Sequence, residues 1–83
     1  MEKSIHTQEY AVVLRVLREA RQDAGLTQTE LAEKIEETQS FVSKVERGEL
    51  RLDILQLRHI CRALGLSLSE FVDRLERGLA SRK

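Results

Sequence analysis

Residues 27–48, TQTELAEKIEETQSFVSKVERG, constrain the fold of this chain more than any other stretch, because they predict two short helices joined by a tight turn. Thr27 precedes an apolar run and has Glu30 three residues later, which is the pattern of an N-cap with a capping box. Thr38 is the N-cap candidate of a second run, and Gly48 follows that run, where a glycine commonly ends a helix. Two helices of this length cannot bury their own apolar faces, so flanking helices must cover them.

The apolar residues of both predicted helices recur at helical spacing. The inward face of the first helix consists of Leu31, Ala32 and Ile35. The inward face of the second helix consists of Phe41, Val42 and Val45. The polar face that remains on the second helix consists of Gln39, Ser40, Ser43 and Lys44. We expect this polar face to point away from the core.

Three more helices are predicted around this pair, so the expected fold is all-α with five helices. The expected ranges are 8–24, 28–35, 39–47, 54–64 and 68–77. Asp53 with Gln56, and Ser67 with Glu70, repeat the capping-box pattern before the last two helices, and Gly78 is expected to end the last one. The helix over 54–64 is expected to bury Ile54, Leu57, Ile60, Cys61 and Leu64. One shared core is predicted from Leu31, Val42, Val45, Leu57 and Leu64.

A chain of 83 residues without proline is long enough for one helical domain with a small core. Residues 8–78 are predicted to form this domain, residues 1–7 a flexible lead-in and residues 79–83 a short basic tail. No apolar run approaches the length of a membrane span, and the N-terminus is too polar for a signal peptide. We therefore expect no membrane partner.

Enzyme and metal patterns are missing from the sequence. His6, His59 and Cys61 do not have the spacing of metal ligands, and there is no Ser/His/Asp, Cys/His or glycine-rich phosphate-binding pattern. The single cysteine lies among apolar residues and is interpreted as a small buried hydrophobe, which suits a reducing cytoplasm. We expect no enzyme activity, no catalytic residue, no metal and no cofactor.

Charge gives only mild support to a nucleic-acid partner, because fourteen basic and fourteen acidic residues give a net charge of zero. Residues 27–37 carry one lysine and four glutamates, a net charge of −3. Residues 38–51 have a net charge of +1, and residues 52–83 a net charge of +2. The acidic excess thus lies on the first helix of the pair, and the second helix and the residues after it are basic.

This layout resembles the phage-repressor/Cro-like, or Xre-type, family of helix-turn-helix DNA-binding proteins. The matching residues, in register over roughly residues 9–77, are Leu17, Arg21, Gly25-Leu26-Thr27-Gln28, Leu31-Ala32, Ile35, Ser40, Val42-Ser43, Val45-Glu46, Gly48 and Ala63-Leu64-Gly65-Leu66-Ser67. The family has a glycine and then an apolar residue in the turn, where this chain has Glu36-Glu37. Glu36 is therefore expected in a left-handed conformation, which costs a non-glycine residue about 1 kcal/mol or somewhat more.

The resemblance implies a sequence-specific transcriptional regulator, more specifically a repressor, with double-stranded DNA as its partner. In such proteins the second helix of the pair enters the major groove N-terminus first, and the corresponding base-contact candidates are Gln39, Ser40, Ser43 and Lys44. The candidates for contacts with DNA phosphates are Thr27, Gln28, Thr38, Arg47 and Arg51. Gln28 carries over a family role in phosphate binding, and the alternative is a solvated residue at a helix start.

Arg51 has two alternatives that the sequence does not separate. It reaches a phosphate or a minor-groove edge, or it pairs with Glu46 or Glu49. Glu46 is common at this position in the family, where its role is usually structural.

A symmetric homodimer is predicted, because one helix-turn-helix unit presents few base-reading side chains and joining two half-sites raises the affinity. A two-fold dimer requires an inverted repeat with half-sites about one helical turn apart. The dimer-contact candidates are Leu50, Leu52, Phe71, Leu75 and Leu79. Val12 and Val16 lie outside the inward stripe of the first helix, and either the lead-in or last helix covers them or they form a subunit contact.

A different function also fits the sequence. A protein-interaction adaptor, or an antitoxin-like module with the same fold, is supported by the zero net charge and the acidic helix. Because a chain of this length has no room for a separate ligand-sensing domain, regulation is expected to come from concentration, from dimerisation or from a regulatory protein partner. In either case the resemblance implies a bacterial or phage-type protein that works in the cytoplasm at the nucleoid.

Overall fold

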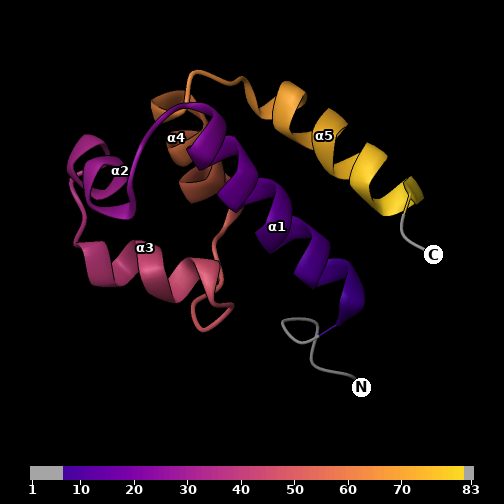
Figure 1. Cartoon of the computed structure of the whole chain (residues 1–83), viewed down its shortest axis with the longest axis horizontal. Coiled ribbons are helices and arrows are strands. Elements are labelled where there is room, and N and C mark those ends of the chain that lie inside the picture. Colours follow the sequence, from indigo (N-terminus) through magenta and orange to yellow (C-terminus); the bar gives the residue numbers. More distant parts are fainter. Residues whose placement is uncertain (1–6, 82–83) are drawn as a thin grey trace.

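Five α-helices make up the part of the chain that the computed structural model describes, residues 7–81 (Figure 1). They are α1 (Gln8–Asp23), α2 (Gln28–Lys34), α3 (Gln39–Glu46), α4 (Ile54–Ala63) and α5 (Leu68–Ser81), and no strand occurs in this range. The all-α, five-helix prediction is confirmed, and each of the first four helices begins at its predicted residue and ends one residue earlier. Residues 1–6 of the predicted lead-in and the last two residues of the predicted tail lie outside the described range, and Thr7, the last residue of the predicted lead-in, is the N-cap of α1.

The starts of α2, α3, α4 and α5 are each closed by the side chain that the sequence pattern indicates. The complete capping boxes are Thr27 with Glu30, Asp53 with Gln56, and Ser67 with Glu70. The Thr38 hydroxyl accepts a hydrogen bond from the Phe41 N–H at 3.0 Å. These caps satisfy backbone donors that an isolated helix leaves open, so the helix starts are determined locally.

The prediction that Gly78 ends α5 is wrong, because α5 continues to Ser81 and includes the first part of the predicted tail. Gly78 lies instead where α5 runs alongside α1 (Figure 1). A Cβ atom at this position would lie 3.0 Å from Cγ1 of Val12 and 3.5 Å from Cγ2 of Val16. The glycine thus allows the two helices to approach closely. Val12 and Val16 are buried here, which confirms coverage by the last helix and excludes their role as a subunit contact.

The turn between α2 and α3 has the strained geometry that was expected. Glu36 has a φ of 59°, in the left-handed region. The N–H of Glu37 donates to the carbonyl of Ala32 at 2.9 Å, and the N–H of Glu36 donates to that of Glu33, which closes the end of α2. The turn lets α2 and α3 cross steeply (Figure 1).

The core forms where all five helices meet, and most of its predicted members are confirmed. Leu31, Val42, Val45 and Leu64 are buried, and Leu57 packs partly buried against them. Cys61 is fully buried, and this burial raises the pKa of its thiol to about 11. The expected burial of Ile54 is wrong, because this first residue of α4 is 61% exposed. Within residues 7–81, none of the helices combines the length and apolar character that a membrane crossing requires.

Candidate nucleic-acid interface

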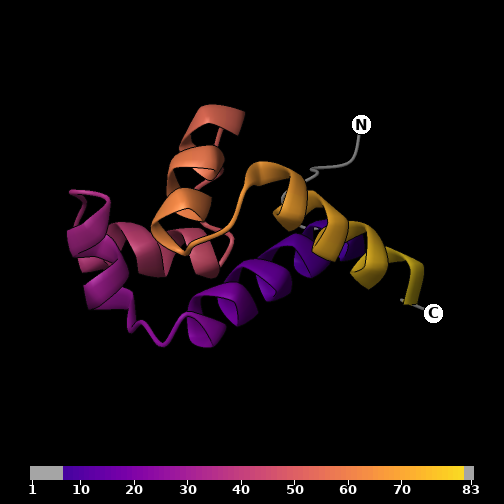
Figure 2. The same cartoon turned by 90° about the horizontal axis from the view of Figure 1, so that it is seen from above.

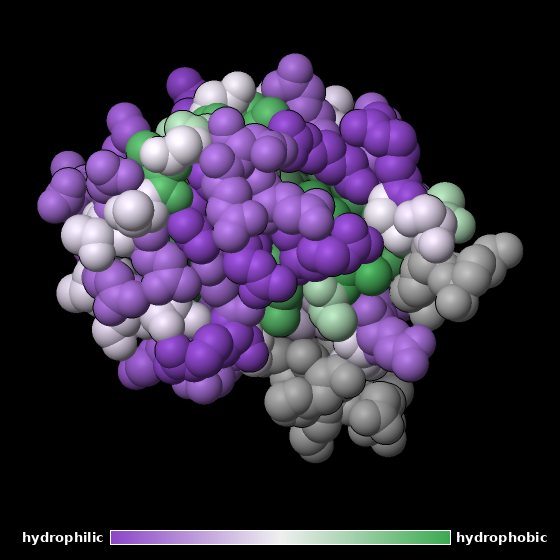
Figure 3. Space-filling model, in the orientation of Figure 1, coloured by the Kyte–Doolittle hydropathy of each residue, from purple (hydrophilic) through white to green (hydrophobic). Residues whose placement is uncertain are grey.

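The outer face of α3 is polar and open to solvent, as the sequence predicted. Gln39, Ser40 and Lys44 are exposed and Ser43 is half-buried, while Val42 and Val45 anchor the opposite side of the helix in the core. The surface over α3 in Figure 3 is hydrophilic to neutral, without an apolar patch. The helix therefore presents hydrogen-bonding side chains on a rigid support.

A buried ion pair that the sequence analysis missed ties α3 to α1. The Arg21 guanidinium donates to both carboxylate oxygens of Glu46, at 2.7 and 3.1 Å, and a third donor reaches the Leu26 carbonyl at 2.9 Å. The two side chains are only 11% and 4% exposed. Arg21 directly follows the buried Ala20, and Glu46 directly follows the buried Val45. Opposite charges at two positions beside the core were therefore the sequence signal that could have indicated this pair.

A chain of hydrogen bonds extends from this ion pair to the start of α3. The Gln28 amide donates to Oε1 of Glu46 at 2.9 Å. The Gln39 amide in turn donates to Oε1 of Gln28 at 2.7 Å. A phosphate-contact candidate and a base-contact candidate are thus in direct contact, and both are held by the buried Arg21–Glu46 pair. This sequence of contacts restricts the orientation of Gln39 before any ligand arrives.

The C-terminal end of α3 has a second, exposed polar cluster. The Arg47 guanidinium donates to both carboxylate oxygens of Glu49, at 2.9 and 3.1 Å, and also to the hydroxyl of Ser43. The hydrogen bond from Arg47 holds the pKa of Glu49 below its ordinary value, and Glu49 raises the pKa of Arg47. Arg47 is therefore occupied by an acidic neighbour in the free protein.

The remaining phosphate-contact candidates have diverse surroundings. The Arg51 guanidinium carbon lies 4.9 Å from the centre of the Tyr10 ring, which is a cation–π distance. Glu46 and Glu49, the acidic partners considered for Arg51, are engaged by Arg21 and Arg47. Thr27 and Thr38 are exposed, and their hydroxyls serve as helix caps.

The dimer-contact candidates do not form one exposed face. Phe71 is fully buried in the core, so its prediction as a dimer contact is wrong. The helical stripe of α5 led to the error, because the core of the single chain takes up its central aromatic residue. Leu52, Leu75 and Leu79 pack partly buried against the core, and Leu50 is 37% exposed.

Comparison with known proteins matches a segment that includes the helix-turn-helix pair α2 and α3. Residues 17–71, more than half of the chain, match the model of the family described as helix-turn-helix, HTH_3. A curated protein of Methanothermobacter thermautotrophicus, named an uncharacterized HTH-type transcriptional regulator, is 38% identical over 50 residues. These residues are 60% of this chain and 72% of that protein.

Solved structures with this fold include two informative examples. The XRE-family like protein from Pseudomonas syringae pv. tomato is 42% identical with a TM-score of 0.79, over 89% of this chain and 90% of that chain. The restriction-modification controller protein C.Esp1396I, solved as a tetramer in complex with its natural 35-base-pair operator, is 26% identical with a TM-score of 0.83. That match covers 92% of this chain and 100% of the controller.

Proposed function

Because this chain belongs to the Xre-type helix-turn-helix family of DNA-binding transcription regulators, we propose that it is a repressor that reads a specific operator. In this proposal two copies bind an inverted repeat as a homodimer, and each inserts α3 into the major groove. Gln39, Ser40, Ser43 and Lys44 then face the edges of the base pairs.

The hydrogen bonds that connect Gln39 to Gln28 and Glu46 carry this proposal. A glutamine reads adenine through two hydrogen bonds, which requires a fixed amide plane. Here the Gln39 amide is held at 2.7 Å by Gln28, and Gln28 is held by the buried Glu46. A side chain restricted in this way loses little conformational freedom when it binds a base, which favours recognition over loose surface contact.

Contacts with DNA phosphates are expected to set the position of α3 in the groove. Gln28 and Thr27 lie at the start of α2, next to Gln39, and Thr38 caps α3 itself. Lys44 is exposed one turn further along α3. Arg47 joins this set when it exchanges the carboxylate of Glu49 for a phosphate oxygen.

Selection of bound sites from random duplex DNA tests this function. The expected product is an inverted repeat with half-sites about one helical turn apart, bound by two chains. Gel mobility and sedimentation of the complex give the number of chains per site. A selected site without repeat symmetry that is bound by one chain would contradict the homodimer, and failure to enrich any sequence would contradict specific recognition.

The second candidate is a protein-interaction adaptor or antitoxin-like module, which is favoured by the zero net charge and by Glu33, Glu36 and Glu37 exposed on and beside α2. A salt titration separates the two functions. Affinity for DNA falls steeply as salt rises, because binding releases counterions from the phosphates. An adaptor is expected to show weak DNA binding with little difference between selected and random duplexes.

A further inference from the structure

The loop between α3 and α4 has a fixed path, because it is held at both ends. At the end of α3, the Glu49 N–H donates to the Lys44 carbonyl at 2.8 Å. At the other end, Asp53 caps the start of α4, and Leu52 packs partly buried against the core. This loop and the start of α1 both lie at the lower side of the molecule in Figure 1. Arg51 therefore extends from a backbone segment whose place is determined by the fold.

The side chain of Arg51 lies over an aromatic ring of α1. Its guanidinium carbon is 4.9 Å from the centre of the Tyr10 ring, inside the range of a cation–π interaction. Tyr10 is half-buried in the first turn of α1, where its backbone N–H donates to the Thr7 hydroxyl at 3.0 Å. Tyr10 and Arg51 line a groove of about 270 Å³ together with Val13 and with Leu79 of α5. The ring that Arg51 contacts is therefore attached to a capped, folded helix start.

Tyr10 orients Arg51 in a way that a carboxylate cannot. Arg47 donates its N–H groups to both carboxylate oxygens of Glu49, which compensates the charge of the guanidinium. An aromatic ring instead attracts the face of a guanidinium, and a phosphate is bound through the N–H edge. The contact with Tyr10 is therefore compatible with a phosphate contact of the same side chain, because it does not neutralise the positive charge of Arg51.

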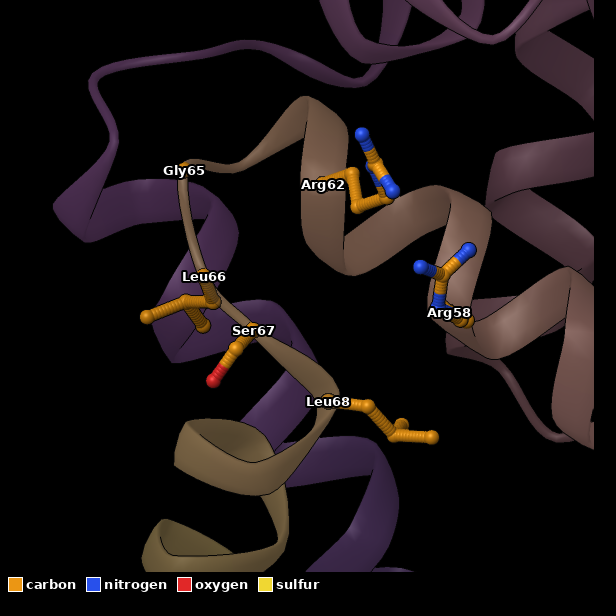
Figure 4. A pocket seen from close by; sticks show the side chains of 6 residues that line it. All are labelled: Arg58, Arg62, Gly65, Leu66, Ser67 and Leu68. Atoms are coloured by element: carbon orange, nitrogen blue, oxygen red, sulfur yellow. The ribbon is translucent and has the colours of Figure 1, made fainter.

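The arginines on α4 show what such a support adds. Arg58 and Arg62 extend from the same side of α4 and line a groove with Ser67 and Leu68 (Figure 4). Within residues 7–81, neither guanidinium lies over an aromatic ring or forms an ion pair. Their side chains keep more conformational freedom, so ordering them on a ligand costs more entropy. Arg51 is the arginine of the described chain that a ring orients in advance.

We propose that Tyr10 is a positioning residue for DNA binding, because its ring holds the Arg51 guanidinium where it meets a phosphate at the edge of the major groove. The eight residues of α3 span about 12 Å at 1.5 Å per residue, which is about the width of the major groove. When the start of α3 faces the bases, the loop after its end therefore lies near the sugar–phosphate backbone. The inference rests on the proposed function, since it adds one phosphate contact and its support to the same complex.

A double-mutant cycle tests whether Tyr10 acts through Arg51. Arg51→Gln should lower the affinity for selected and random duplexes alike and reduce the salt slope by about one, as for one lost phosphate contact. Tyr10→Leu should lower the affinity about two- to fivefold, because an unsupported arginine loses more freedom on binding. In the Arg51→Gln background, Tyr10→Leu should have no further effect. An equal effect in both backgrounds would overturn the proposal, since Tyr10 would then act independently of Arg51.

Conservative and control variants separate the ring from other roles of this region. Tyr10→Phe keeps the ring and should restore the affinity that Tyr10→Leu loses. Glu9→Gln tests a rival support, because Glu9 lines the same groove as Arg51, and it should not lower the affinity. A loss equal to that of Tyr10→Leu would assign the positioning to Glu9 and overturn the proposal. Arg77→Gln removes one positive charge from α5, which lies apart from α3 in Figures 1 and 2, and should leave the salt slope unchanged. Circular dichroism confirms that each variant keeps its helices.

The contact between Tyr10 and Arg51 also has a readout that needs no DNA. In the free chain, the ring current of Tyr10 should shift the NMR signals of the Arg51 side-chain protons upfield. Tyr10→Phe should keep this shift, and Tyr10→Leu should abolish it. Arg51 signals at the positions of an ordinary exposed arginine in the wild type would overturn the proposal, whatever the DNA affinities are.

The outcomes separate this inference from the proposed function. Sequence-specific binding that Tyr10→Leu leaves unchanged would overturn the role of Tyr10 while the proposed function stands. A wild-type chain that binds no duplex would overturn the proposed function and the phosphate contact of Arg51 together, even with the ring-current shift present. A shifted Arg51 signal, a loss with Tyr10→Leu that Tyr10→Phe avoids, and non-additivity with Arg51→Gln together support the proposal.

Discussion

Internal hydrogen bonds hold the polar side chains of the helix-turn-helix pair, whereas the arginines on the outer face of α4 make no such bonds within the described residues. At the start of α3, Gln39 is connected through Gln28 to a carboxylate that is 4% exposed, so its orientation is held in the free protein. On α4, the Arg58 and Arg62 side chains make no such contacts within the described residues, and Leu55 projects into solvent.

This difference matters for recognition through hydrogen bonds. A surface that reads hydrogen-bonding patterns gains from being ordered in advance, because less entropy is lost on binding. The ordered surface consists of Gln39, Gln28 and the supporting Arg21–Glu46 pair, and removal of these supports should weaken it in stages from the core outward.

The largest effect is expected from Glu46→Ala, which removes the buried support of the ordered surface. This change leaves the Arg21 guanidinium buried without its counter-charge, which typically costs about 3–5 kcal/mol in the free energy of unfolding. Urea denaturation measures the loss. Glu49→Ala is the control, since its ion pair with Arg47 is exposed, and it should change the stability far less. Equal losses in the two variants would mean that Glu46 does not support the surface.

The order and ends of the helices were largely predictable, whereas the supports of the site were not. Capping boxes at Thr27, Asp53 and Ser67 are local patterns, so they appear directly in the sequence. The Arg21–Glu46 pair joins residues 25 positions apart, and only the packing of α1 against α3 brings them together. Local patterns cannot specify such a contact.

The errors at the C-terminal half have a similar cause. The pattern predicts a helix end at Gly78 because glycine often ends helices, but here the missing Cβ allows the close contact with Val12. Helical periodicity alone places Ile54 in the core and Phe71 at a dimer contact, whereas Ile54 is exposed and Phe71 is buried. Periodicity identifies an apolar face, but it does not tell how far along the helix the core extends.

The second-largest effect is expected from Gln28 and Gln39, which connect the buried Glu46 to the proposed base contacts. Gln39→Ala should reduce discrimination at one or two base pairs of the selected site by about 1–3 kcal/mol. Gln28→Ala should weaken binding to all sequences through its lost phosphate contact, and also reduce part of the discrimination, because Gln28 holds Gln39 at 2.7 Å.

A double-mutant cycle measures this coupling directly. The loss of the double variant should be smaller than the sum of the two single losses, because each change removes the same hydrogen bond. Binding constants on the selected site and on single-base variants supply the data. Strict additivity would show that the two side chains act independently on DNA.

A smaller effect is expected at the turn that sets the angle between α2 and α3. Glu36→Gly should relieve the left-handed strain of about 1–2 kcal/mol at φ 59°. The added freedom of glycine in the unfolded chain offsets about 0.4–1 kcal/mol, so the net gain in stability should be about half a kcal/mol. Thermal unfolding measures it, with Glu37→Gly as the control that should destabilise. A loss of stability for Glu36→Gly would mean that the glutamate makes a compensating contact.

The smallest effect is expected at Glu49, because its carboxylate holds Arg47, the side chain that we propose contacts a DNA phosphate. Glu49→Gln removes the negative charge that engages Arg47, so affinity should rise roughly two- to fivefold on selected and random duplexes alike, with no change in base preference. Arg47→Ala should lower the affinity and reduce the salt slope by about one.

The pH dependence of the wild-type affinity provides an independent test of the same pair. Because the pKa of Glu49 is held below its ordinary value by the hydrogen bond from Arg47, the carboxylate stays charged at neutral pH and retains Arg47. The restraint is lost only as the pH falls through that lowered pKa. The advantage of Glu49→Gln over the wild type should therefore stay constant from neutral pH down to the ordinary pKa of a glutamate and shrink below it. An advantage that already disappears above the ordinary pKa would show that another group restrains Arg47.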